Sequence, residues 1–189
     1  MVRNKKGESG IGTLIIFIAM LLVAAVAAGV LIQTIGSLQN KALTTGQQSK
    51  SQISTHLEVV NMVGTDGADG VIENTTLVTK LSAGSESIQF NELIITVDTI
   101  NSFATLSYQS NETLYAKANY VVDYLQNGTN HRDGYLVRGD VAQLSVQLPN
   151  NLNESEQVRF DMIPKIGVPT SIEVTMPDIM TTLRVHLYP

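Results

Sequence analysis

The most constraining feature of this 189-residue chain is an uncharged apolar run over residues 11–32. As an α-helix these 22 residues would be about 33 Å long, enough to cross the ~30 Å hydrocarbon core of a bilayer. Three basic residues, Arg3, Lys5 and Lys6, precede the run. Such a positive flank holds an N-terminus on the cytoplasmic side. Together, the length of the run and this flank predict that the N-terminal segment enters a membrane.

Three interpretations of this run compete. A cleaved secretory signal normally has an apolar region of only about 7–15 residues. A permanent single-pass anchor fits the length of the run. The third interpretation is a helix that is stored in the membrane and later packs against copies of itself. The small residues over 23–30 favour the third, because small side chains let helix backbones approach closely.

The helical pattern continues beyond the apolar run. Apolar residues recur on one helix face at Ile35, Leu38, Ala42, Ile53, Leu57 and Val60. Their spacings are three and four if the small residues Gly46 and Ser49 fill the gap between Ala42 and Ile53. The spacing predicts one assembly helix over residues 8–62, about 80 Å long. A helix of this length with no partner in its own chain is expected to pack on other copies.

From residue 63 onward the apolar period changes to two. Alternating segments, separated by Gly, Pro and Asn, lie at 77–81, 93–97, 116–124, 144–148, 158–162, 172–176 and 183–187. About seven to nine short strands at such intervals predict an immunoglobulin-like antiparallel β-sandwich, or else a barrel. The expected fold class is α+β: a long N-terminal hydrophobic α-helix, then a β-sandwich outer domain over residues 63–189.

Composition excludes several functions. The chain has 17 acidic and 12 basic residues and a formal charge of -5, which argues against binding to nucleic acid. It has no cysteine, and its three histidines are scattered, so no disulfide, thiol or metal-ligand spacing is present. No Ser/His/Asp arrangement or phosphate-binding loop stands out. We therefore expect neither an enzyme nor a cofactor.

Three short motifs are better interpreted as turns. The His-Arg-Asp triplet at 131–133 lacks the other kinase motifs and is expected in a hairpin loop. The Arg-Gly-Asp triplet at 138–140 matches a tripeptide that adhesion receptors recognise, but its glycine is expected in a turn. Asp66 and Asp69 are weak candidates for a metal ion, because they lack the acidic spacing of an EF-hand and fit a solvated turn.

Four tripeptides match the acceptor pattern for N-glycosylation. They begin at Asn74, Asn111, Asn127 and Asn153, and none has proline in the middle. All four follow the predicted helix, where loops and strand ends are expected. The pattern fits an exported head domain that carries sugars.

Both ends of the chain resemble archaeal flagellin (archaellin) preproteins, which are type IV pilin-like. At the start the resemblance rests on Lys-Lys-Gly at 5–7, the residues at 9–15 and 17–20, and the Val/Ala/Gly-rich stretch 23–32. At the end it rests on Phe160, Ile163, Pro164, Gly167, Pro169, Thr170, Glu173, Pro177 and the terminal Leu-Tyr-Pro at 187–189. Between the two ends the resemblance is diffuse.

This resemblance implies a maturation pathway. A prepilin-type signal peptidase would cut between Gly7 and Glu8, behind Lys5 and Lys6, so that residues 1–7 form a signal peptide and the helix is retained. The precursor would wait in the cytoplasmic membrane until an assembly ATPase at a membrane platform extracts it. The subunits, alone or with other archaellins, would form the extracellular archaeal flagellum, a rotating filament for swimming. The residues expected in its core are Ile11, Leu14, Phe17, Ile18, Leu21, Leu22, Val26 and Val30.

Two alternatives remain at this stage. A subunit of a type IV pilin-like adhesion filament shares the cut and the helix. However, many pilins have a glutamate at the fifth mature position, where this chain has Gly12. A membrane-anchored surface module that binds a ligand would need the helix to stay in the bilayer and a concave site in the head.

Overall fold

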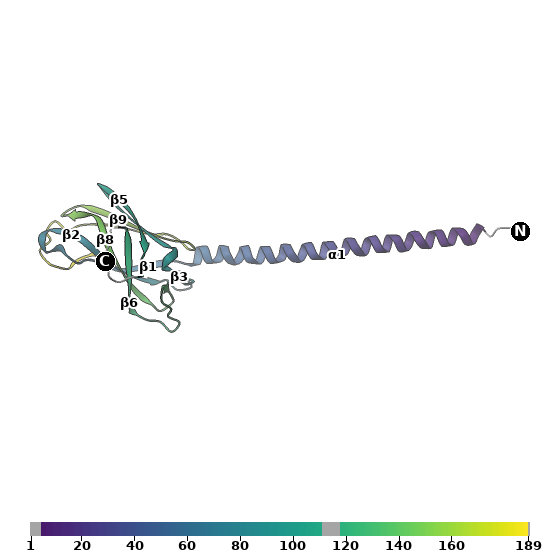
Figure 1. The fold of residues 1–189 in the computed structure, drawn as a ribbon, viewed down its shortest axis with the longest axis horizontal. Helices are drawn as coiled ribbons and strands as arrows, with labels where there is room; N and C mark the ends of the chain where they lie inside the picture. The colour runs from purple at the N-terminus through teal and green to yellow at the C-terminus, as the bar shows by residue number, and fades with distance from the viewer. Residues whose placement is uncertain (1–4, 111–117, 189) are drawn as a thin grey trace. The chain divides into compact units, whose positions relative to one another are not determined.

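The computed structural model describes residues 5–110 and 118–188. The chain divides into two compact units, Met1–Gln48 and Ser49–Pro189. Helix α1 (Lys5–Ser54) fills the first unit and supplies the first residues of the second, whose strands form the head (Figure 1). Its 50 residues correspond to about 75 Å. No proline precedes Pro149 in the sequence, so nothing removes a backbone donor from the helix.

The helix ends eight residues before the predicted boundary at residue 62. Residues 57–64 form strand β1 (Leu57–Gly64), in which Leu57, Val59 and Met62 are buried. Leu57 and Val60 match a helical spacing from Ile53, and this coincidence made the longer prediction wrong. Pairing of β1 with a strand on each side decides the outcome, because it buries alternate side chains in the core of the head.

The head contains eleven strands among the described residues. They are β1, β2 (Val71–Leu81), β3 (Ile88–Gln89), β4 (Leu93–Thr99), β5 (Ser102–Tyr108), β6 (Asn119–Gln126), β7 (Tyr135–Leu136), β8 (Val141–Asn153), β9 (Gln157–Pro164), β10 (Thr170–Thr175) and β11 (Val185–Tyr188). Two 3-10 helices, η1 (Gly67–Asp69) and η2 (Phe90–Glu92), lie in the loops. The main sheet has the order β10-β9-β4-β5-β6-β8-β2-β1-β11, and β3 pairs with β7.

The main sheet forms a sandwich because its two halves enclose one core. The halves are β10-β9-β4-β5 and β6-β8-β2-β1-β11, and a parallel pairing of two residues between β5 and β6 joins them. Every other pair of the named strands is antiparallel, as predicted. The buried Tyr120 of β6 places its hydroxyl 2.9 Å from the carbonyl oxygens of Phe90 and Leu93 in the other half. On the opposite side, the hydroxyl of Thr170 donates to the Leu57 carbonyl at 2.6 Å.

The described residues form eleven strands where about seven to nine were predicted, because β1, β5 and the two-residue strands β3 and β7 had no predicted counterpart. Strand β5 was not predicted, because Leu106 is its one fully buried residue and its alternation is weak. The predicted strand at 183–187 begins later, at Val185, since Leu183 is exposed. The turn-rich stretch 64–70 directly follows the predicted helix, so the sequence predicts a hinge between helix and head there. In the structure it connects β1 to β2 inside the head. The predicted strand residue Ala116 lies outside the described residues.

The predicted turns at 131–133 and 138–140 form one loop structure around Asp140. This buried carboxylate accepts hydrogen bonds from the Gly128 amide at 2.6 Å and the Val137 amide at 3.1 Å. His131 Nδ1 lies 3.2 Å from it, and Gly139 has a φ of 90°, as a tight turn requires. Because its aspartate is buried, the Arg-Gly-Asp triplet is not displayed to a receptor.

The same contacts shift two pKa values. Burial raises the pKa of Asp140, but the hydrogen bonds from Gly128, His131 and Val137 outweigh burial and hold this pKa below its ordinary value. The hydrogen bond to Asp140 raises the pKa of His131, with a further contribution from Asp133. The loop is therefore held most firmly when His131 is protonated and Asp140 is ionised.

This pair predicts a pH dependence of head stability. A raised histidine pKa stabilises the fold below about pH 6.5, and this contribution is lost as the pH rises through the folded-state value. A lowered aspartate pKa stabilises the fold above about pH 4, and this contribution is lost as the pH falls through the folded-state value. We expect the melting temperature of the head, followed by circular dichroism, to fall between pH 6 and pH 8. His131→Gln should flatten this fall, whereas the exposed His186→Gln should preserve it. Equal slopes in wild type and His131→Gln would contradict the assignment.

Candidate assembly helix and head surface

The first unit exposes apolar side chains on every side of α1. Each residue from 9 to 50 is exposed except the half-buried Gly36. Residues 14–18 are five consecutive large apolar residues, each exposed. Successive positions on an α-helix are about 100° apart, so these five surround the axis. Such a helix segment has no polar face, so a bilayer or another protein must cover it.

The eight predicted core residues all lie on this uncovered surface. Their exposed fractions range from 48% for Ile18 to 68% for Val26. The set is Ile11, Leu14, Phe17, Ile18, Leu21, Leu22, Val26 and Val30. Within one chain none of the eight contributes to a core, so their packing in a filament stays a prediction.

By length and composition, the part of α1 over residues 9–54 could also cross a membrane. It is the one helix in the described part of the chain that meets this test, and its most apolar segment is entirely unburied. The predicted cut between Gly7 and Glu8 lies in the first turn of α1, ahead of the apolar run. The helix could therefore be lipid-embedded first and protein-embedded later without losing any of its apolar residues.

Five glycines of α1 have open space around them within the described part of the chain. A Cβ atom added at Gly10, Gly12, Gly29, Gly36 or Gly46 would meet no other heavy atom within 4 Å. Each glycine costs about 1 kcal/mol of helix stability relative to alanine. Since no intrachain contact needs the space, these glycines are suited to the close approach of another chain.

Small residues also form a shallow depression on α1. Its lining is Ile16, Ala19, Met20, Val23, Ala24 and Ala27. The three alanines supply little bulk between larger neighbours, so a ridge of side chains from another helix would fit there. The depression therefore offers a specific place for the predicted helix–helix contact.

The weak metal candidates, Asp66 and Asp69, both accept hydrogen bonds from nearby backbone amides. Asp66 accepts hydrogen bonds from the backbone amides of Glu73 and Asn74 and from the Asn74 side chain at 3.0 Å. Asp69 accepts one from the Val71 amide at 3.3 Å. Over the described ranges, no three His, Asp or Glu side chains gather as a metal site. These hydrogen bonds hold the turn between β1 and β2, and metal binding at the two aspartates stays a weak prediction.

The candidate glycosylation sites differ in accessibility. Asn127 is exposed in the loop after β6. Asn153 is exposed at the end of β8, where its amide nitrogen lies 3.3 Å from Glu156 Oε1. Asn74 is half-buried inside β2, and its amide donates to Asp66. Asn111 lies outside the described residues. Attachment of a sugar at any of the four stays a prediction.

The profile of archaeal-type flagellins matches residues 7–174 of this chain. Flagellin A2 of Haloferax volcanii is 35% identical, with 92% of this chain and 90% of that protein covered. Flagellin B1 of Methanococcus voltae is 33% identical, with 97% of this chain and 96% of that protein covered. The similarity therefore extends through the helix and most of the head.

Solved structures show the same fold. A subunit of the archaeal flagellum of Methanospirillum hungatei superposes with a TM-score of 0.70, covering 94% of this chain and 98% of that one at 15% identity. Flagellin FlaB1 of Methanocaldococcus jannaschii gives a TM-score of 0.62 over 70% of this chain and 96% of that one, at 19% identity. The chain, with its apolar helix and sandwich head, belongs to the archaeal-type flagellin family, and its role is that of a structural subunit of the archaeal flagellar filament.

Proposed function

We propose that this chain reaches its filament through a membrane-held precursor and is locked there by its helix. A prepilin-type signal peptidase cuts between Gly7 and Glu8, an assembly ATPase at the membrane platform extracts the subunit, and α1 packs against copies of itself or related flagellins. The rotating extracellular filament then drives swimming. The observation that carries the proposal is an apolar helix exposed on all sides, joined to a head with a complete core of its own.

The energetics fit this order of events. Burying each large apolar side chain in place of leaving it in water is worth about 1.5–3 kcal/mol, so a filament core of such helices is stable in water. Lipid hides the same side chains equally well, so burial alone does not move α1 out of the bilayer. An ATPase is therefore the appropriate source of energy for extraction. Once in the filament, close packing at glycine and alanine supplies the specific contacts.

Two features favour a flagellin over the alternatives. The fifth mature position is Gly12, where many pilins carry a glutamate. A surface module with a permanent anchor would not need helix glycines that have open space around them. Such a module would remain a membrane-bound monomer, and electron microscopy of surface filaments with the subunit's N-terminal residue determined separates the two.

We further propose that the head carries N-linked sugars, with Asn127 the most accessible acceptor. Its side chain is exposed, and among the described residues it forms no hydrogen bond. Asn153 comes next. Asn74 would first have to release Asp66.

Filling the depression on α1 should prevent assembly. Ala24→Leu together with Ala27→Leu adds bulk where a neighbouring helix is expected, while the apolar character needed for membrane insertion is kept. We expect electron microscopy to show filament yield reduced about tenfold or more, with the protein retained in membranes. Ala68→Leu, the same change at an exposed residue of the head, is the control and should still form filaments. Normal filaments from the double variant would contradict a close helix contact at this depression.

Blocking the cut should trap the precursor. Gly7→Val places a β-branched side chain where the peptidase must reach the backbone, whereas Gly10→Val adds the same bulk beyond the cut. Mass spectrometry of membranes should show uncut chains for Gly7→Val, and no filaments should form. Gly10→Val chains should still begin at Glu8. Filaments built from uncut Gly7→Val subunits would overturn the proposed processing.

Glycopeptide mass spectrometry of purified filaments tests the sugars. We expect the highest occupancy at Asn127, lower occupancy at Asn153, and the lowest at Asn74. Asn127→Gln should remove the corresponding glycopeptide without changing the amount of filament. Unmodified Asn127 in filaments that carry sugar on Asn74 would contradict the order deduced from accessibility.

A further inference from the structure

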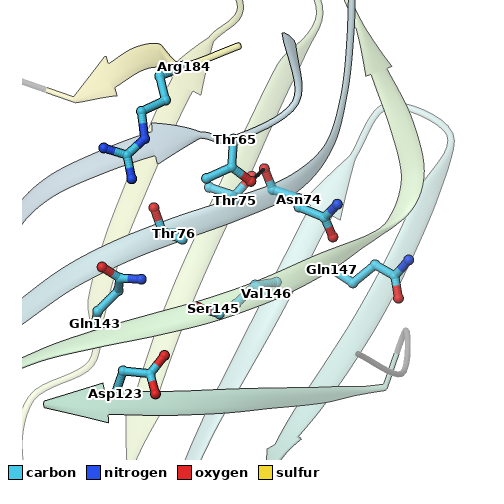
Figure 2. Close-up of a pocket in the computed structure, with 10 residues that line it drawn as sticks. All are labelled: Thr65, Asn74, Thr75, Thr76, Asp123, Gln143, Ser145, Val146, Gln147 and Arg184. Carbon is cyan, nitrogen blue, oxygen red and sulfur yellow. Dashed lines mark hydrogen bonds between the residues drawn. The ribbon is translucent and has the colours of Figure 1, made fainter. Parts of the chain in front are cut away.

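The solvent-facing side of the β6-β8-β2-β1-β11 half-sheet is hollowed into a groove of about 440 Å³. Figure 2 shows its side chains spread across neighbouring strands, with Asp123 and Arg184 on opposite sides of it. The lining consists of Thr65, Asn74, Thr75, Thr76, Asp123, Gln143, Ser145, Val146, Gln147 and Arg184. This volume falls within the usual range for sites that bind small molecules.

The strand register brings the polar groups of this groove together. Asp123 of β6 pairs with Gln143 of β8. Farther along β8, Ser145 pairs with Thr76 of β2, and Gln147 pairs with Asn74. Side chains two residues apart on a strand share a face, so Gln143, Ser145 and Gln147 form one row about 13 Å long, room for a di- or trisaccharide.

The groups most able to bind a ligand are not occupied within the head. Among the described residues, the side chains of Asp123, Gln143, Gln147 and Arg184 form no hydrogen bond or ion pair. Their donors and acceptors are therefore free for a ligand. Thr75 and its pair Val146 are 1% exposed and face the core, so neither offers a polar side-chain group to the groove.

The chemistry of the lining selects a class of ligand. Val146 is the one apolar residue of the lining and is 1% exposed, so the apolar anchors of a protein interface are missing. One cation is too few for a nucleic acid. Primary amides offer a donor and an acceptor side by side, which matches the adjacent hydroxyls of a sugar. An arginine offers a fork that matches a carboxylate.

We propose that this groove binds a short saccharide that carries a carboxylate. The carboxylate lies against Arg184, and the sugar hydroxyls lie along Gln143, Ser145 and Gln147. Asp123 accepts hydrogen bonds from hydroxyls at the other side, and its negative charge disfavours a ligand with acidic groups at both ends. Such a saccharide could belong to a neighbouring copy of this chain or to a polysaccharide outside the cell.

Binding is tested on the full-length chain, produced in a host that adds no N-glycans and kept in detergent micelles. The acidic probe is 3′-sialyllactose, a trisaccharide with a single carboxylate at one end, labelled with a fluorophore at its other end. Maltotriose is the neutral competitor, and fluorescence anisotropy reports binding. We expect saturable binding of sialyllactose that Arg184→Gln weakens about tenfold or more. Arg138→Gln, the same change at an exposed arginine outside the groove, should leave it unchanged. The double variant Gln143→Leu and Gln147→Leu should weaken the binding of both sugars. Absence of saturable binding, or equal affinities for the two arginine variants, overturns the proposal.

Filaments from the native host then identify the source of the saccharide. Binding of sialyllactose to unmodified filaments indicates an external polysaccharide. Binding only after Asn127→Gln and Asn153→Gln indicates that sugars of neighbouring copies fill the groove. Binding to neither overturns the proposal. Because the micelle experiment needs no filament, its outcome is independent of whether the chain assembles.

Discussion

An apolar helix without cover in its own chain is the constraint on which the rest of this molecule depends. Residues 11–32 contain no charge, and large apolar side chains there surround the helix axis. No arrangement of a single chain in water keeps these residues out of solvent at low free energy. Each state of the protein must therefore supply a cover. On the proposed pathway lipid covers the helix first, and other subunits cover it later in the flagellar filament of which this family forms the subunits.

The head can accompany such a helix because its own core is complete. Two half-sheets enclose Leu144, Phe160 and their neighbours, and Tyr120 bonds across to the opposite half. The chain has no cysteine, so packing and hydrogen bonds hold this core without disulfides. The side chains on the outer faces of the strands are therefore not needed to form this core. On one half-sheet such outward-facing side chains line the proposed saccharide groove.

Local sequence patterns predicted most of this architecture and failed where two patterns coincide. The apolar run and the alternating segments identified the helix and most strands. The helix boundary was wrong because Leu57 and Val60 satisfy both a helical and a strand period, and the pairing of β1 that decides between them is nonlocal. Strand β5 escaped prediction because Leu106 alone is fully buried. The groove could not be predicted, since it depends on a register that places Asp123 beside Gln143 and Thr76 beside Ser145.

The central claim is that neighbouring subunits cover α1 in the assembled filament. The chain has no cysteine, so a single introduced cysteine gives an unambiguous readout with a maleimide reagent. Ala24→Cys lies in the apolar helix, and Gln126→Cys lies at the exposed end of β6. In intact filaments we predict rapid labelling at position 126 and almost none at position 24, with position 24 becoming reactive once the filament is dissociated. Equally rapid labelling of both positions in intact filaments would contradict the account.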